Sequence, residues 1–209
     1  MYIDGSATDP CEPEFTRLGY GLAMVDENGS LLAVAHVVPP PWITDSAGAE
    51  AWALYVSLTF APVAPNIVTD CLGLLRRLQD GTCRATAEAQ PHARIWGMIL
   101  NILDSDKQVI ACAEKLFWMP SHIARCDIGQ STKSDGTAVS ALDWRANRLA
   151  DAAAKQSAMA NRPPSQVRER LKFLQQAYSD GIVALATVTH AANYHQVTTL
   201  DETGAIATI

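Results

Sequence analysis

The chain has 209 residues, of which 48% are hydrophobic and 18% are charged. This length can bury one substantial core plus an appendage, and the composition excludes a largely disordered chain. No apolar run approaches the roughly 18 residues of a membrane span, and no signal-peptide pattern opens the sequence, so we expect no membrane partner. The five cysteines are scattered and odd in number, which favours reduced thiols and an intracellular protein.

The net charge of −6 argues against tight binding of nucleic acid, but the charges are unevenly distributed. Residues 1–70 contain nine acidic residues and one basic residue, whereas residues 145–172 contain seven basic and two acidic residues. This division suits an enzyme in which a basic stretch binds phosphates beside an acidic metal cluster. A solvated helix face explains the basic stretch equally well.

In the first part of the chain, alternating apolar residues, a turn signal and two amphipathic segments predict strands and helices. The expected elements are strands at residues 1–4, 18–26, 30–38 and 67–70, and helices at 46–60 and 72–80. The first strand is short, with three residues before Asp4, whereas a central strand usually has five or six. We therefore expect a truncated first strand and a chain that is a fragment of a longer reading frame.

The second part of the chain predicts fewer strands and more helices. The expected elements are a polar connection at 82–91, a helix at 92–103, a strand from Gln108 to Ala113 or on to Trp118, a mobile loop at 120–139, a helix at 140–160 opened by a capping box, and two helices at 167–178 and 181–195 before a frayed tail. Early strands followed by strand–helix alternation imply an α/β fold with a mixed sheet between helices. Arg162-Pro163-Pro164 marks a boundary, so we expect one domain over residues 1–160 and a helical extension over 161–209.

Four acidic residues occupy positions that suit a metal-dependent nuclease. Asp4 and Asp70 end short apolar runs, while Glu50 and Asp151 lie on predicted helices. Carboxylates that converge from separate elements repel one another unless cations lie between them. Such a site suits Mg²⁺ (or Mn²⁺) and in-line attack on a phosphodiester.

Two of these positions, and the histidine at position 122, have competing interpretations. Asp70 can cap the helix that follows it without giving up its role as a ligand. Asp143 competes with Asp151 for the fourth position; eight residues place them about 12 Å apart on a helix, so they cannot serve one metal interchangeably. We favour Asp151 as the ligand and Asp143 as a helix cap. His122 and Cys126 have the spacing of two zinc ligands but lack a second pair nearby.

Five short motifs resemble, in order, those of the type 1 ribonuclease H family. They are Asp4-Gly5-Ser6, Ala49-Glu50, Thr69-Asp70, Trp118-Met119-Pro120-Ser121-His122 and the segment from Asn147 to Lys155. The resemblance covers residues 1–157 and implies a five-stranded mixed sheet that hydrolyses the RNA strand of RNA–DNA hybrids. It implies that Asp4 bridges two metals, with Glu50 and Asp70 on one and Asp151 on the other. His122 would assist proton transfer or product release, a task that imidazole side chains commonly perform.

The resemblance extends to ribonuclease H domains of retroelements around residues 143–147, which implies a possible reverse-transcriptase domain upstream. Residues 79–95 contain only Arg84 and Arg94 as basic residues, so the family's basic protrusion is missing and we expect weak, salt-sensitive binding. Residues after Ala160 have no counterpart in the minimal fold. Two other functions stay open: a catalytically degenerate scaffold or binding module, and a nuclease of the same superfamily that acts on DNA.

Overall fold

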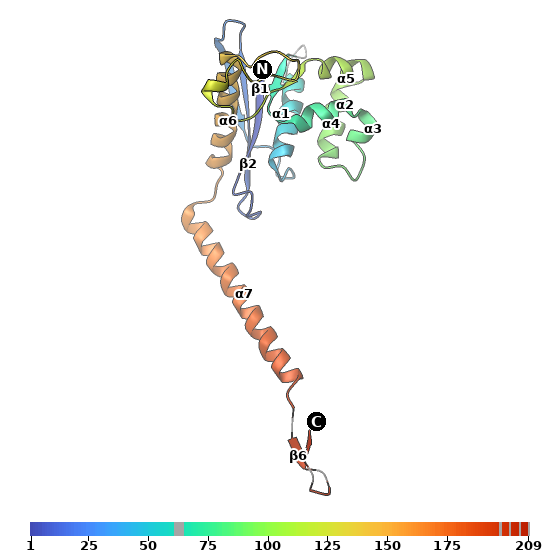
Figure 1. Cartoon of the computed structure of the whole chain (residues 1–209), viewed down its shortest axis with the longest axis vertical. Coiled ribbons are helices and arrows are strands. Elements are labelled where there is room, and N and C mark those ends of the chain that lie inside the picture. Colours follow the sequence, from blue (N-terminus) through green and yellow to red (C-terminus); the bar gives the residue numbers. More distant parts are fainter. Residues whose placement is uncertain (61–64, 197, 201, 205, 209) are drawn as a thin grey trace. The chain divides into compact units, whose positions relative to one another are not determined.

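The computed structural model describes residues 1–60, 65–196, 198–200, 202–204 and 206–208. The chain divides into two compact units, Met1–Arg162 and Pro163–Ile209, which are described separately. In the first unit, helices cover both faces of one sheet (Figure 1).

Five strands form the sheet of the first unit, in the order β3-β2-β1-β4-β5. They are β1 Tyr2–Thr8, β2 Arg17–Val25, β3 Leu31–Val37, β4 Ile67–Thr69 and β5 Leu116–Trp118. β1, β2 and β3 are antiparallel, whereas β4 is parallel to both β1 and β5. The predicted five-stranded mixed sheet is therefore confirmed. The prediction that the first strand ends at Asp4 is wrong, because β1 continues through four more residues that pair with β2.

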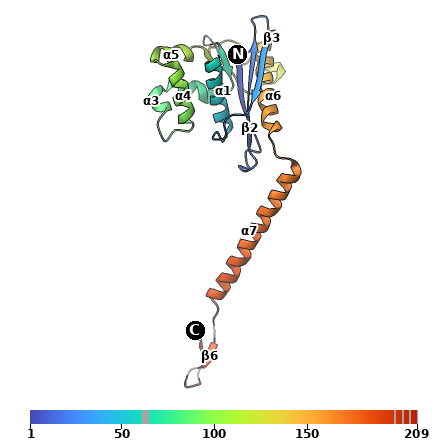
Figure 2. The same cartoon turned by 180° about the vertical axis from the view of Figure 1, so that it is seen from behind.

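The helices of the first unit lie in two layers. They are α1 Ser46–Phe60, α2 Leu72–Gln79, α3 Thr82–Ala85, α4 Ala93–Leu103, α5 Asp106–Ala113 and α6 Ala141–Ala160. α6 packs alone on one face of β1 and β2, while α1 and α4 lie on the opposite side of the sheet (Figures 1 and 2). Successive side chains of β1 point to opposite faces of the sheet, so the strand packs against both helix layers. Tyr2 packs with Ala150 of α6, and Ile3 packs with Leu54 of α1.

Three segments differ from the prediction. Residues 106–113 form helix α5 rather than a strand; Ser105 accepts a hydrogen bond from the Gln108 backbone N–H at 3.3 Å and caps it. The connection at 82–91 contains the short helix α3. The segment predicted as a loop at 120–139 contains the 3₁₀ turn η1, Arg125–Asp127, and a β-bridge between Thr132 and Ala138.

The second unit contains one long helix, α7 Ser165–Asn193, where two were predicted. Strands β6 Thr198–Leu200 and β7 Ile206–Thr208 follow and pair antiparallel, in place of a frayed tail. Gly181, at which the second of these helices was predicted to begin, lies inside α7. In the described part of the chain, no helix has the length and apolar character needed to cross a membrane.

Candidate active site

The register of β1 and β4 brings two of the acidic residues side by side. Ile3 pairs with Thr69 in the parallel ladder, so Asp4 and Asp70 are the next residues along neighbouring strands. β4 ends at Thr69, and carboxylates that approach from either face of the sheet can meet there. The Gly5 backbone N–H donates to Asp4 Oδ1 at 2.7 Å, which fixes the orientation of that carboxylate.

A glycine lets α1 approach the sheet closely enough to add Glu50. A Cβ on Gly5 would lie 2.6 Å from the Glu50 backbone nitrogen and 2.8 Å from the Ser46 carbonyl oxygen. Both are backbone atoms, so a side chain at this position would force the helix away from β1. The Glu50 carboxylate also accepts a hydrogen bond from Thr69 Oγ1 at 3.2 Å.

Asp4, Glu50 and Asp70 together form the carboxylate cluster. One oxygen from each residue lies within 4.8 Å of the other two. Asp4 and Glu50 are buried, with exposed fractions of 6% and 7%. Burial, and then the charge of Asp70, raise the pKa of Asp4 to about 7. Burial and the neighbouring acids also raise the pKa of Glu50 and that of Asp70. Three desolvated carboxylates at this spacing fit an oxygen-preferring divalent cation, which would remove their mutual repulsion.

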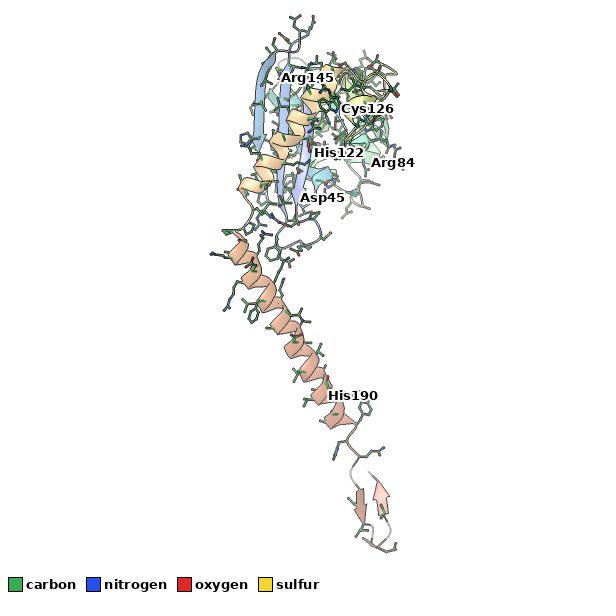
Figure 3. All side chains as sticks on the ribbon, turned by 60° about the vertical axis from the view of Figure 1, so that its left-hand side comes forward. Asp45, Arg84, His122, Cys126, Arg145 and His190 are labelled. Carbon is green, nitrogen blue, oxygen red and sulfur yellow. The ribbon has the colours of Figure 1, made fainter. Side chains whose placement is uncertain are left out.

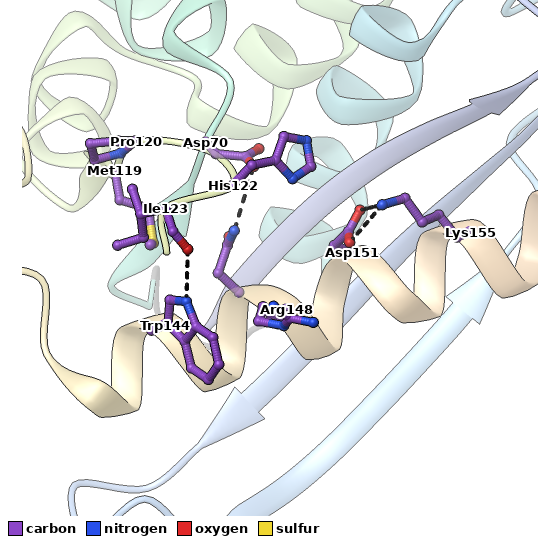
Figure 4. Close-up of a pocket in the computed structure, with 10 residues that line it drawn as sticks. Asp70, Met119, Pro120, His122, Ile123, Trp144, Arg148, Asp151 and Lys155 are labelled. Atoms are coloured by element: carbon purple, nitrogen blue, oxygen red, sulfur yellow. Dashed lines mark hydrogen bonds and ion pairs between the residues drawn. The ribbon is translucent and has the colours of Figure 1, made fainter. Parts of the chain in front are cut away.

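Asn147 of α6 supports Asp70. Its Nδ2 donates to Asp70 Oδ2 at 3.4 Å (Figure 4), and this hydrogen bond opposes the rise in the pKa of Asp70. Asn147 is buried, and its Oδ1 has no hydrogen-bond partner within the protein. Asn147 lines a hollow of about 220 Å³ together with Asp70 and Asp151.

Asp151 lies beside the cluster rather than within its 4.8 Å limit. Its charge and a hydrogen bond reach Asp4 and contribute to the raised pKa of that residue. Lys155, one helical turn further along α6, lies 2.8 Å from both carboxylate oxygens of Asp151 (Figure 4). α6 comes this close because Gly21, the β2 partner of Asp4, has no side chain; a Cβ there would collide with the Ala150 carbonyl oxygen.

His122 lines the same hollow on the side opposite α6, where its side chain is exposed to solvent (Figure 4). It is close enough to Asp70 to lower the pKa of that carboxyl. The Trp118 indole N–H donates to the Asp70 carbonyl oxygen at 2.9 Å and joins the end of β5 to the cluster. The Trp144 indole N–H donates to the Ile123 carbonyl oxygen at 3.0 Å and holds the segment that carries His122.

Asp143 has a structural environment that differs from that of Asp151. Its carboxylate accepts hydrogen bonds from Tyr2 Oη at 2.8 Å and Ser140 Oγ at 2.6 Å, and it faces Lys133 Nζ at 3.3 Å. Although burial opposes the charge, the hydrogen bonds hold the pKa of Asp143 below its ordinary value. The predicted capping box is confirmed.

The zinc alternative gains no support. Among the residues that the structure describes, the one group of three or more potential ligands is the carboxylate cluster, and Cys126 Sγ instead donates to its neighbour Asp127 at 3.6 Å. Several cations of the basic stretch at residues 145–172 already have partners within the protein. Arg162 pairs with Asp9 at 2.7 Å, Arg148 stacks on Trp144, and Lys155 pairs with Asp151.

Three supporting residues were not predicted as such: Thr69, Asn147 and Lys155. Each lies inside a motif that resembles the family, next to a proposed ligand or four residues from one. The Asp151–Lys155 spacing of i,i+4 is the one sequence signal that predicts a specific pair.

No protein-family model matches the sequence, and none of the curated proteins does. Among solved structures, the chain is similar to the ribonuclease H domain of PFV (prototype foamy virus), with 16% identity and a TM-score of 0.50 over 76% of this chain and 93% of that one. It is also similar to ribonuclease H1 of Halobacterium salinarum, with 17% identity and a TM-score of 0.43 over 75% of this chain and 93% of that one. A further match is the foamy viral protease–reverse transcriptase in complex with an RNA/DNA hybrid, with 15% identity and a TM-score of 0.46 over 75% of this chain and 19% of that one.

The PFV domain shows that the chain has the ribonuclease H fold. This agrees with the resemblance that its sequence motifs carry and with the order of its five strands.

Proposed function

We propose that the chain is a divalent-metal-dependent endonuclease that hydrolyses the RNA strand of RNA–DNA hybrids. The observation that carries this proposal is the carboxylate cluster: three acids from three separate elements, two of them buried, within 4.8 Å of one another on a ribonuclease H fold. Burying like charges together destabilises a protein, so a cluster of this kind is best explained by a function that needs it.

Asp4, Glu50, Asp70 and Asp151 would hold Mg²⁺ or Mn²⁺, and the bound cations would supply an activated water and stabilise the departing oxygen of the phosphodiester. The protein's own contribution is positioning. Gly5 N–H orients Asp4, Thr69 orients Glu50, and Asn147 orients Asp70.

His122 would take up and release a proton at the edge of the site. Its side chain is exposed beside Asp70, and imidazole is a common proton carrier in catalysis. Recognition of the RNA strand requires contacts to the 2′-OH. A hollow of about 400 Å³ bordered by Gly5, Ser6 and Ser46 leads from the surface to the cluster, and it offers backbone and hydroxyl groups for this purpose.

The decisive experiment compares Asp70→Asn with Glu88→Gln, whose exposed carboxyl lies outside the cluster. Purified wild-type protein with Mg²⁺ should cleave a hybrid whose RNA strand is labelled, and it should leave the DNA strand and a DNA duplex intact. Asp70→Asn should lower the rate by about a hundredfold or more, as when one member of a cooperating set is lost. Glu88→Gln should cleave like the wild type. Equal rates for the two variants would refute the assignment.

A non-catalytic scaffold is the second candidate, and the ion pair of Asp151 favours it. Lys155 contacts both oxygens of that carboxylate, which a metal would have to displace. This candidate predicts hybrid binding without cleavage in Mg²⁺ and in Mn²⁺ at every pH.

Retroelement origin rests on the motif around residues 143–147, and an in-frame reverse-transcriptase-like sequence upstream of Met1 would support it.

A further inference from the structure

Helix α7 presents an apolar seam that no other described residue of its own unit covers. It spans 29 residues, about 43 Å at 1.5 Å per residue, and none of them is buried. The other described elements of this unit, β6 and β7, pair with each other. Side chains project from α7 along its whole length (Figure 3).

The composition of α7 indicates that the helix needs a partner. Long helices in proteins draw most of their stability from packing of an apolar face rather than from intrinsic propensity. Gly181 lies near the centre, and the second half contains several β-branched residues, including Val183, Thr187 and Val188, which are mediocre helix formers.

One set of apolar residues follows the alternating three- and four-residue spacing of a coiled coil, while Phe173, Ile182 and Val183 lie outside it. Leu171, Leu174, Tyr178, Leu185 and Val188 occupy this seam, and Gly181 falls at the position that completes it. Leu174 is 47% exposed and Leu185 is 68% exposed. On the opposite side, Gln176 donates to Asp180 at 2.7 Å, as expected for a solvated face.

We propose that α7 binds α7 of a second copy of this chain as an antiparallel coiled coil. In the heptad, Leu171, Tyr178 and Leu185 occupy the a positions, and Leu174, Gly181 and Val188 occupy the d positions. In an antiparallel pair, each a residue faces a d residue of the partner helix. Leu174 then lies opposite Leu185, and Tyr178 lies opposite Gly181, so the largest side chain of the seam fills the space that the glycine leaves. In a parallel pair, Tyr178 would face Tyr178 and Gly181 would face Gly181, which overpacks one layer and leaves a void in the next.

Charge favours the same orientation. The first turns of α7 contain Arg168, Arg170 and Lys172 with a single acid, Glu169. A parallel pair would place six cations around one end of the seam. An antiparallel pair places these cations beside the last turn of the other helix, where unpaired carbonyl oxygens carry partial negative charge.

The test measures the mass of the full-length chain by sedimentation over a range of concentrations. The wild type should reach twice the 22.5 kDa of one chain. Leu174→Glu and Leu185→Lys should each weaken association by at least about tenfold. Val183→Glu, which lies on the outer face in the same helix, is the matched control and should associate like the wild type. Circular dichroism and the melting of the first unit verify that every variant is folded.

The double variant with both Leu174→Glu and Leu185→Lys tests the orientation. Opposite charges face each other in the antiparallel pair, so association should recover relative to either single variant, whereas in a parallel pair like charges face each other. A wild type that stays monomeric overturns the proposal, as would happen if α7 packed on its own chain or on another protein. If the two single variants associate as strongly as the Val183→Glu control, the seam residues do not form the interface, and the proposal is overturned. A double variant weaker than both singles overturns the antiparallel arrangement.

Discussion

At the scale of single residues, the carboxyl group of Asp4 makes the stability of the folded protein depend on pH. In the metal-free protein its folded-state pKa is about 7, against 3.8 for an ordinary aspartate, because burial and the charge of Asp70 disfavour ionisation. The folded chain therefore holds a proton that the unfolded chain releases. The free energy of unfolding must fall as pH rises between these two values, and the full penalty is present above about pH 7.

Asp4→Asn should consequently stabilise the metal-free protein. We expect a gain of about 2–4 kcal/mol in EDTA near pH 8, since each pKa unit corresponds to about 1.4 kcal/mol, and almost no gain near pH 4. Urea denaturation at both pH values measures this difference. Mg²⁺ should raise the stability of the wild type and leave the variant nearly unchanged. A variant with the pH dependence of the wild type would contradict the raised pKa.

Asp143 and Asp151 lie on the same helix but should respond in opposite ways. Asp143→Asn weakens the network with Tyr2, Ser140 and Lys133, so it should lower stability by about 1–3 kcal/mol while the folded fraction still cleaves. Asp151→Asn removes a half-exposed ion pair and also eases the repulsion on Asp4, so it should change stability by less than about 1 kcal/mol while activity is lost. Thermal melting and hybrid cleavage measure the two effects. A stable, inactive Asp143→Asn would reverse the assignment.

The acids themselves were predictable from the sequence, because each ends an apolar run or lies on an amphipathic helix in a spaced motif. Their mutual distances were not. The position of Thr69 beneath Glu50 depends on the depth at which α1 packs, and the hydrogen bond from Asn147 to Asp70 depends on the rotation of α6. Both are properties of tertiary packing that no local pattern contains.

At the scale of elements, two glycines of β2, Gly19 and Gly21, determine how closely α6 approaches the sheet. Gly21→Ala would drive a methyl group into the backbone of Ala150 and Ala154, and neither can move without moving the helix. We expect a loss of about 2–4 kcal/mol and a displaced Asp151. Gly97→Ala, in the interior of α4 with no atom within 4 Å of the new Cβ, is the control and should stabilise by about 0.5–1 kcal/mol. Urea denaturation measures the effect of each substitution on stability. Equal effects of Gly21→Ala and Gly97→Ala would show that Gly21 does not control how closely α6 packs on the sheet.

Two elements show where local patterns fail. Residues 108–113 form an apolar run too short to distinguish a strand from a buried helix by periodicity. The Ser105 cap and the inward-facing Val109 and Cys112, three residues apart, favour the helix. A second helix was predicted to begin at Gly181, yet one glycine costs a helix only about 1 kcal/mol, which the surrounding turns can offset. By contrast, α1 and α6 were predicted almost to the residue: α1 has a clear apolar spacing, and in α6 the capping box and the apolar spacing agree.

At the scale of the whole molecule, the division at Arg162 and Pro163 predicts that the first unit folds without the second. The two core clusters consist entirely of residues before Arg162. Arg162 itself closes the unit, because its guanidinium donates to both oxygens of Asp9 in the loop after β1. Neither core cluster should therefore lose a contact when residues 163–209 are removed.

A chain that ends after Arg162 should keep the melting temperature of the first unit within a few degrees and should cleave hybrid at the wild-type rate per chain, because every proposed ligand lies before that point. It should also sediment as a monomer, since α7 is absent. A second truncation, after Ala160, removes the pair with Asp9 and should melt at a lower temperature while keeping its activity. Loss of folding in the first truncation would show that the second unit completes the core, whereas loss of cleavage with folding intact would place part of the nuclease site beyond Arg162.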